Sequence, residues 1–149
     1  MALAPLLRFP FLRDRKVNRM REERRRMIQS SLVAVVDDDE SVRESLPDLL
    51  REYGFTARSF SSAEEFLASE YVSQTNCLIL DVGMPGMSGP ELQRELKLRG
   101  QYIPIVFITA NRDEAVRPRV LAQGAVACLF KPFSDTALLD ALNKALQVN

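Results

Sequence analysis

The sequence of 149 residues contains no histidine, only two cysteines and no apolar run long enough to span a membrane. The absence of histidine excludes histidine-based catalytic triads, metal sites with histidine ligands and a phosphohistidine formed on this chain. Cys77 and Cys128 lie in apolar runs and lack the spacing of a metal-binding pair, so we interpret them as small buried side chains in a reducing cytoplasm. Chemistry in this chain must therefore use carboxylates, hydroxyl groups, lysine or a bound metal.

The formal net charge is zero, but two parts of the chain differ strongly in charge. Residues 1–30 carry nine Lys or Arg and three Asp or Glu, whereas residues 31–149 carry eleven and seventeen. We interpret 1–30 as a basic N-terminal extension, poorly ordered or locally helical, and 31–149 as one domain. The extension is either a solvated tail or a basic arm for nucleic acid or an acidic membrane surface. Pro5, Arg8 and Pro10 interrupt its apolar start, which disfavours a secretion signal.

Five short predicted strands alternate with five amphipathic segments from Ser31 onward. Four of the strands are continuous apolar runs, which are typical of strands buried on both faces of a parallel sheet. These four are Leu32–Val36, Cys77–Leu80, Ile105–Ile108 and Val126–Phe130, and the remaining strand is Phe55–Phe60. Because β-α crossovers between parallel strands are right-handed, the pattern predicts an α/β fold with an open, doubly wound, five-stranded parallel sheet.

The segments between the apolar runs predict helices that each carry one apolar stripe. The expected ranges are about 40–53, 61–71, 90–99, 113–123 and from Ser134 onward. Ser61 or Ser62 is a suitable N-cap for the second helix, and Ser134 for the last. Pro47 should kink the first helix or delay its first turn, and Pro118 disfavours the fourth helix.

Polar residues follow four of the predicted strands. Asp37, Asp38, Asp39 and Glu40 follow the first strand, Asp81 the third, Thr109 the fourth and Lys131 the fifth. In an open α/β sheet, the carboxyl ends of the strands border the functional crevice, so we expect these side chains to lie close together. The acidic run could simply stabilise the N-terminus of the helix that follows it, through the helix dipole. Because several carboxylates in a row exceed what capping needs, and because oxygen ligands select hard cations, we favour a Mg²⁺ site.

Considered alone, Asp81, Thr109 and Lys131 each have an ordinary structural interpretation. Asp81 could cap a loop, Thr109 could merely end a strand and Lys131 could be a surface lysine. Together, they predict a carboxylate nucleophile toward phosphorus beside a metal, with a hydroxyl donor and a mobile cation for the phosphoryl oxygens.

This ordered set of residues resembles the receiver domain of two-component response regulators. The resemblance covers about Leu32–Leu146 and rests on four stretches in the right order and spacing. They are the acidic run at Asp37–Glu40, the segment from Asp81 to Gly89, the pair Thr109–Ala110, and Lys131–Pro132–Phe133. Asp81 follows Asp38 by 43 residues, and Lys131 follows Asp81 by 50. The loop after Asp81 and the stretch at Lys131 are similar to receivers of nitrogen-fixation-type transcriptional regulators.

The resemblance implies a flavodoxin-like sheet with strand order 2-1-3-4-5 and a role for each matched residue. Asp81 would be the phosphoacceptor. The Mg²⁺ ligands would be Asp81, Asp38, Asp37 (partly through water) and the Gly83 carbonyl. Thr109 and the Ala110 amide would hold the phosphoryl group, and Lys131 would bridge to it. The Lys131–Pro132 peptide bond would be cis.

Three positions differ from the family pattern. Cys128 stands three residues before Lys131, where the family has its aromatic switch residue. Phe130 is a candidate substitute, although we expect it to point in a different direction from Cys128. Gly83 and Asn111 occupy the two positions that border the water which would hydrolyse the phosphoryl group, so we expect them to tune its lifetime.

The resemblance also implies partners. A histidine kinase or a phosphotransfer protein would supply the phosphoryl group from its phosphohistidine, and this chain would assist its own transfer and dephosphorylation without being an enzyme for a separate substrate. Because the chain ends one helix after Lys131, we expect a single-domain regulator that signals to a downstream protein, without direct DNA binding or a membrane span. The expected contact and homodimer surface is the face formed by the fourth helix, fifth strand and fifth helix of the domain.

Three alternatives remain open at this stage. The chain could be the receiver fragment of a DNA-binding transcriptional regulator that lacks its output domain. It could be a small phosphatase of aspartyl type, although short loops leave little for a lid over a substrate. It could also be a receiver-like protein that binds partners without phosphate, which the presence of Asp38, Asp81, Thr109 and Lys131 disfavours.

Overall fold

The computed structural model describes residues 15–26, 30–110 and 114–147. Its centre is a five-stranded sheet in the order β2-β1-β3-β4-β5, and every pair of neighbouring strands is parallel. The strands are β1 (Leu32–Val36), β2 (Thr56–Phe60), β3 (Cys77–Asp81), β4 (Ile105–Thr109) and β5 (Ala127–Phe130). The predicted fold class and strand order are therefore confirmed.

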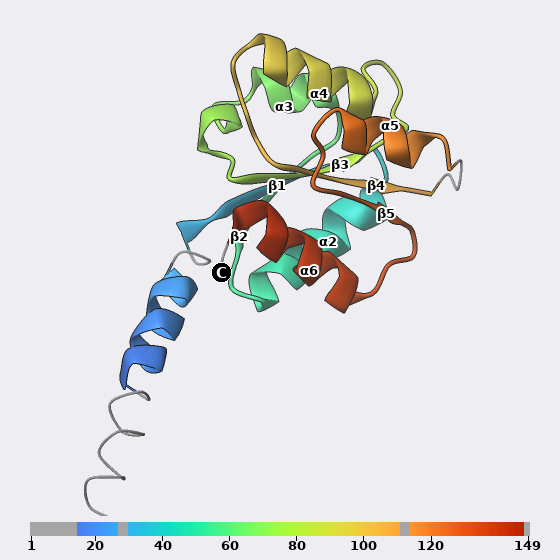
Figure 1. Cartoon of the computed structure of the whole chain (residues 1–149). Coiled ribbons are helices and arrows are strands. Elements are labelled where there is room, and N and C mark those ends of the chain that lie inside the picture. The colour runs from blue at the N-terminus through green and yellow to red at the C-terminus, as the bar shows by residue number, and fades with distance from the viewer. Residues whose placement is uncertain (1–14, 27–29, 111–113, 148–149) are drawn as a thin grey trace, which may run out of the picture.

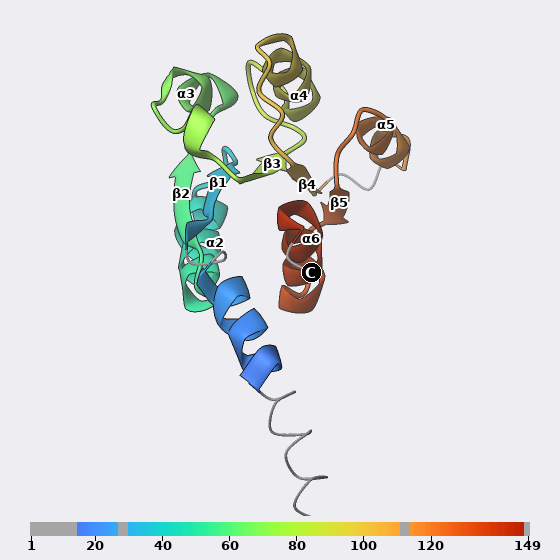
Figure 2. The ribbon, with the colours of Figure 1, turned by 60° about the vertical axis from the view of Figure 1, so that its left-hand side comes forward.

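Helices cover both faces of this sheet, as Figures 1 and 2 show. They are α2 (Glu40–Glu52), α3 (Ala63–Ala68), α4 (Gly89–Leu98), α5 (Val116–Ala122) and α6 (Asp135–Leu146). Helices α2 and α6 lie on one face, and α3, α4 and α5 lie on the other. This two-sided cover explains why the central strands consist of continuous apolar runs.

Alternation along each strand divides the core into two clusters. In β1, Val33 and Val35 face the cluster formed with α2 and α6, whereas Ala34 and Val36 face the cluster formed with α3, α4 and α5. Both cysteines are free and buried, as predicted. Burial raises the pKa of the Cys77 thiol to about 12, so the thiol stays neutral and acts as a small apolar side chain.

The second predicted helix is shorter than expected. It was expected to reach Tyr71, but α3 ends at Ala68, and a short 3₁₀ turn follows at Val72–Gln74. Ser69 ends the helix because its hydroxyl donates to the Phe66 carbonyl, at 2.7 Å, while its backbone is extended. Tyr71 then packs against the ring of Phe60, with centroids 6.4 Å apart.

The two helix prolines act differently. Helix α2 begins at Glu40 and runs through the buried Pro47, so of the two effects expected of this proline, a kink or a late first turn, the late first turn does not occur. Helix α5 begins only at Val116, which makes Pro118 its third residue. Because the amides of the first turn have no acceptor within a helix, Pro118 costs little there and helps set the late start. Asp113, where this helix was expected to begin, lies outside the described residues.

Within the basic extension, residues 15–26 form a helix whose residues are all exposed. It lies outside the sheet and its covering helices (Figure 1). Residues 1–14 and 27–29 of the extension lie outside the described part, so the expectation of poor order is not tested there. Among the helices that the structure describes, none is long and apolar enough to cross a bilayer.

Candidate functional site

The carboxyl edge of the sheet brings together the polar residues predicted from the strand ends. Asp81 is the last residue of β3 and Thr109 the last of β4, while Asp37 and Lys131 directly follow β1 and β5. Backbone bonds hold these ends in register. The Asp37 amide donates to the Phe60 carbonyl at 3.2 Å, and the Lys131 amide donates to the Thr109 carbonyl at 2.8 Å.

Three carboxylates form the centre of this site. One oxygen each from Asp37, Asp38 and Asp81 lies within 4.8 Å of the others. Asp37 is fully buried and Asp81 is 6% exposed, whereas Asp38 is exposed at the mouth of the site. Like charges at this spacing repel one another in a poorly solvated place, and an oxygen-coordinating cation would relieve that repulsion. The donor set, all oxygen without sulfur or nitrogen, fits Mg²⁺.

The Lys131 ammonium supplies positive charge to the same cluster. Its Nζ lies 2.8 Å from Asp37 Oδ2 and 3.9 Å from Asp81 Oδ1. The lysine therefore pairs mainly with the buried Asp37, with Asp81 next to it. Asp37 Oδ1 also accepts a hydrogen bond from the Asp39 amide at 2.9 Å, which fixes the orientation of its carboxylate.

Electrostatics distinguish Asp81 from an ordinary surface carboxylate. Burial raises the pKa of Asp81 to about 7, with a further increase from the negative charge of Asp37 that the Lys131 ammonium only partly offsets. A carboxylate that is this costly to ionise gains most from a neighbouring cation. Its environment thus couples the charge of Asp81 to cation binding.

The acidic run after β1 has two separate roles. Asp39 is the N-cap of α2, and its Oδ1 accepts hydrogen bonds from the Ser41 amide at 2.9 Å and from the Ser41 hydroxyl at 2.8 Å. These bonds hold the pKa of Asp39 below its ordinary value. The acidic run, for which capping and a cation site were considered as alternatives, is thus divided: Asp39 caps the helix, and Asp37 and Asp38 belong to the carboxylate cluster.

The residues expected to hold a phosphoryl group lie around the carboxylates. Thr109 is 2% exposed at the end of β4, and Ala110 is exposed directly after it. Gly83 is exposed in the loop after β3, and a Cβ atom built on it would meet no atom within 4 Å. The Lys131–Pro132 peptide bond is cis, as the resemblance implied. Asn111 lies outside the described residues.

Gly89 has a structural role that the sequence did not reveal. It begins α4, and its amide donates to the Val82 carbonyl at 3.0 Å, which closes the loop after Asp81. A Cβ atom on Gly89 would lie 2.3 Å from the Asp81 carbonyl oxygen and 3.0 Å from Phe107 Cε1. Only glycine lets α4 start this close to the backbone of the candidate nucleophile. A run of several glycines and prolines after Asp81 gave no hint of which one was needed.

The expectation that Phe130 points differently from Cys128 was wrong. The two residues are two positions apart in β5, and such residues share one face of a sheet. Cys128 is 2% exposed in the cluster that includes Val120 of α5. The Phe130 ring lies 5.9 Å from the Arg117 guanidinium carbon of the same helix. Phe130 is thus an aromatic side chain on the α5 side of the sheet, opposite Thr109 in the strand register.

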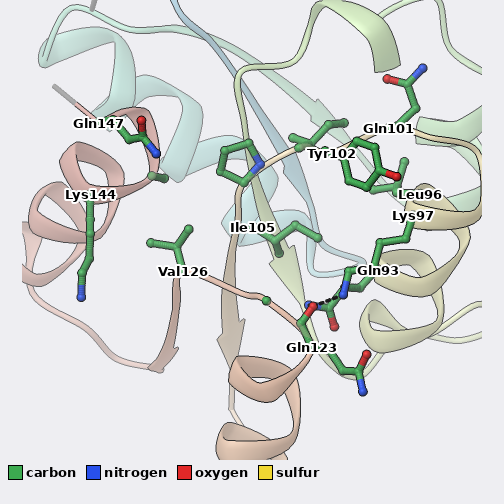
Figure 3. A pocket seen from close by; sticks show the side chains of 14 residues that line it. Gln93, Leu96, Lys97, Gln101, Tyr102, Ile105, Gln123, Val126, Lys144 and Gln147 are labelled. Carbon is green, nitrogen blue, oxygen red and sulfur yellow. Dashed lines mark hydrogen bonds between the residues drawn. The ribbon is translucent and has the colours of Figure 1, made fainter.

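A hollow lies at the opposite, amino edge of the sheet, where β4 and β5 begin (Figure 3). Its volume is about 270 Å³, and the side chains around it are mainly amide and apolar. The nearly buried Gln93 amide donates to the Val120 and Gln123 carbonyls at 3.3 and 3.4 Å, and Lys97 donates to the Gln123 carbonyl as well. These contacts secure the end of α5 against α4, and no carboxylate lies among the lining residues.

The comparison with protein families decides the identity of this arrangement. Residues 33–143 match the response regulator receiver domain. The chain belongs to the receiver domain family. Receivers are the signalling domains of two-component systems, and this match includes all of the sheet except Leu32 and every residue of the carboxylate cluster.

Individual proteins agree with this assignment. The chain is 42% identical to the response regulator protein TodT of Pseudomonas putida over 120 residues, which cover 80% of this chain and 53% of TodT. It is 44% identical to nodulation protein W of Bradyrhizobium diazoefficiens over 117 residues, which cover 78% of this chain and 52% of nodulation protein W. The receiver thus spans about half the length of the curated relatives it matches.

Solved structures support the same fold. The structure of the response regulator StyR shares 49% identity and a TM-score of 0.74, covering 80% of this chain and 61% of that one. The structure titled FixJ-N is 37% identical in sequence to this chain, with a TM-score of 0.72. The match covers 78% of this chain and 94% of that one. A similarity to FixJ, at 38% identity over 120 residues in Azorhizobium caulinodans, confirms the predicted resemblance to receivers of nitrogen-fixation-type regulators.

Proposed function

We propose that this receiver accepts a phosphoryl group on Asp81 with the help of Mg²⁺. The observation that carries the proposal is the convergence of three carboxylates within 4.8 Å of one another, with the Lys131 ammonium 3.9 Å from Asp81. A buried carboxylate flanked by cation ligands and an ammonium has the components of a metal-assisted phosphoryl acceptor.

In the proposed transfer, an Asp81 carboxylate oxygen forms a bond to the phosphorus of a phosphohistidine on a histidine kinase or phosphotransfer protein. The phosphorus–nitrogen bond breaks, and its electron pair stays on the departing histidine ring, which belongs to the partner because this chain has no histidine. Mg²⁺, when bound, supplies positive charge against the carboxylates and the phosphoryl oxygens. Asp37, Asp38, Asp81 and the Gly83 carbonyl would hold it.

The remaining residues would stabilise the transferred group. Lys131 has a side chain long enough to serve Asp37 in the free protein and a phosphoryl oxygen after transfer, since an ammonium acts as a mobile point charge. The Thr109 hydroxyl and the Ala110 amide would donate hydrogen bonds to the other oxygens. Ala110 suits this role because it is exposed immediately beside the site.

For the output, we propose that the receiver acts in the cytoplasm and signals through protein contacts. The proposed surface is the face of α5, β5 and α6, which would also serve a homodimer. A second candidate is the receiver portion of a DNA-binding transcriptional regulator. The share of TodT and nodulation protein W that this chain covers, about half, favours that candidate. Reading the coding sequence downstream of Asn149 would distinguish the two.

The phosphoryl transfer is tested by its dependence on metal. The protein is incubated with acetyl phosphate in Mg²⁺ or in excess EDTA, and its intact mass is measured. The proposal predicts one added phosphoryl group in Mg²⁺ and none in EDTA. An adduct of equal yield in EDTA would contradict the metal role, and no adduct in either condition would contradict the acceptor role.

A further inference from the structure

The loop that links β3 to α4, residues 82–88, carries the Gly83 carbonyl of the proposed metal site. Its ends are closed by the hydrogen bond from the Gly89 amide to the Val82 carbonyl, and Met84 anchors it in the core with 8% of its surface exposed. The far half of the loop contains Gly86 and Met87, and the Met87 side chain is partly buried against the same core cluster as Met84. Gly86 adopts a positive φ of 75°, so the chain turns sharply there.

A carboxylate from another helix holds this turn. Glu64, in the first turn of α3, accepts a hydrogen bond from the Met87 amide through Oε1 at 2.9 Å. The same carboxylate packs on the bare side of Gly86, where a Cβ atom would lie 3.0 Å from Oε2 and 3.3 Å from Oε1. Both carboxylate oxygens therefore lie against the turn.

Helix α3 does not need Glu64 for its own start. The Ser62 hydroxyl accepts from the Glu65 amide at 3.0 Å, and Glu65 Oε2 accepts from the Ser61 amide at 2.9 Å, which together cap the helix. The two adjacent glutamates thus have different partners. Glu65 caps its own helix, whereas Glu64 accepts a hydrogen bond from a loop residue that lies 23 residues further along the chain.

We infer that Glu64 is a positioning residue for the metal site: it fixes the turn at Gly86 and Met87 and thereby restricts the loop that presents the Gly83 carbonyl. The inference rests on the proposed Mg²⁺ site. Glu64 acts through the backbone and touches neither the ion nor the phosphoryl group. Since Val82 and Met84 also anchor the loop, losing Glu64 should weaken Mg²⁺ binding by about 3- to 10-fold, below the 10–100-fold typical of groups that directly orient a metal ligand.

Three substitutions separate the hydrogen bond from the charge. Glu64→Gln keeps an acceptor oxygen at the same reach and removes the charge. Glu64→Asp keeps the charge but draws the carboxylate back by one methylene, and Glu64→Ala removes both. Glu70→Ala is the control, because Glu70 is an exposed acid just after the same helix and outside this contact. Amide exchange of Met87 is measured by NMR in the metal-free full chain, and the Mg²⁺ dissociation constant is measured by calorimetry.

The inference predicts that Met87 exchanges faster and Mg²⁺ binds more weakly in Glu64→Ala and Glu64→Asp, while Glu64→Gln and Glu70→Ala match wild type within about twofold. The opposite pattern, with Asp like wild type and Gln like Ala, would show a charge effect and overturn it. Unchanged Met87 exchange in Glu64→Ala would also overturn it. If wild type binds no Mg²⁺, the proposed function fails, whereas the contact itself is still judged by Met87 exchange.

Discussion

The two edges of the sheet differ sharply in whether their polar groups are electrostatically satisfied. At the carboxyl edge, three carboxylates crowd together, and the pKa of Asp81 is raised to about 7 by burial and by Asp37. At the amino edge, the Gln93 amide and Lys97 are used to satisfy the carbonyls that end α5 (Figure 3). At the carboxyl edge, the carboxylates repel one another, and a bound cation would relieve that repulsion. At the amino edge, the hydrogen bonds stabilise the fold. Function is therefore expected at the first edge and stability at the second.

The largest effect on stability should come from removing the Lys131 ammonium from the carboxyl edge. Lys131→Met leaves the fully buried Asp37 without its ammonium partner at 2.8 Å. Since breaking such a pair leaves an uncompensated charge, we expect the free energy of unfolding without Mg²⁺ to fall by about 2–3 kcal/mol, less than for a fully buried pair because Lys131 is partly exposed. Urea denaturation measures this.

The matched control is Lys144→Met, which removes an exposed lysine from the rim of the amino-edge hollow. We expect its change in stability to stay within about 0.5 kcal/mol. Equal losses of unfolding free energy in the two variants would contradict the proposed electrostatic difference between the edges.

The second prediction compares Gly83, in the loop after β3, with Gly89, the first residue of α4. Gly89→Ala should destabilise the protein by about 1–3 kcal/mol, because its Cβ would lie 2.3 Å from the Asp81 carbonyl oxygen and the start of α4 must shift. Gly83→Ala should be neutral within about 0.5 kcal/mol, since its Cβ meets open space. Thermal unfolding followed by circular dichroism compares the two. A stable Gly89→Ala would refute the close approach of α4 to Asp81.

The third prediction separates metal affinity from stability at the carboxyl edge. Asp38 is exposed, so Asp38→Ala should leave the metal-free protein as stable as wild type. Its Mg²⁺ affinity should fall at least about tenfold, because one of the three proposed carboxylate ligands is lost. Calorimetric titration measures the affinity, and Mg²⁺ affinity equal to that of wild type would rule out Asp38 as a ligand.

The smallest effect is expected at the amino edge. Gln93→Leu removes the amide that donates to the Val120 and Gln123 carbonyls and should cost about 1 kcal/mol of stability. The Mg²⁺ dissociation constant should not change, because the site lies at the other edge of the sheet. A parallel loss of Mg²⁺ affinity would show that the two edges are coupled.

Sequence patterns predicted the fold and the members of the carboxylate cluster because both follow from periodicity and strand ends. Continuous apolar runs identified the buried strands, and parallel topology then required Asp37, Asp81, Thr109 and Lys131 to meet. The end of α3 at Ser69 escaped prediction because a side-chain hydrogen bond ended the helix before its apolar pattern did. The roles of Gly89 and Glu64 depend on contacts between distant elements, which no local pattern encodes.

Phosphorylation of Asp81 is tested by comparing wild type with Asp81→Asn after incubation with acetyl phosphate and Mg²⁺, and by measuring the intact mass of each protein. We expect one phosphoryl adduct on wild type and none on Asp81→Asn, with both proteins folded by circular dichroism. An adduct of equal yield on folded Asp81→Asn would show that the phosphoacceptor is another residue.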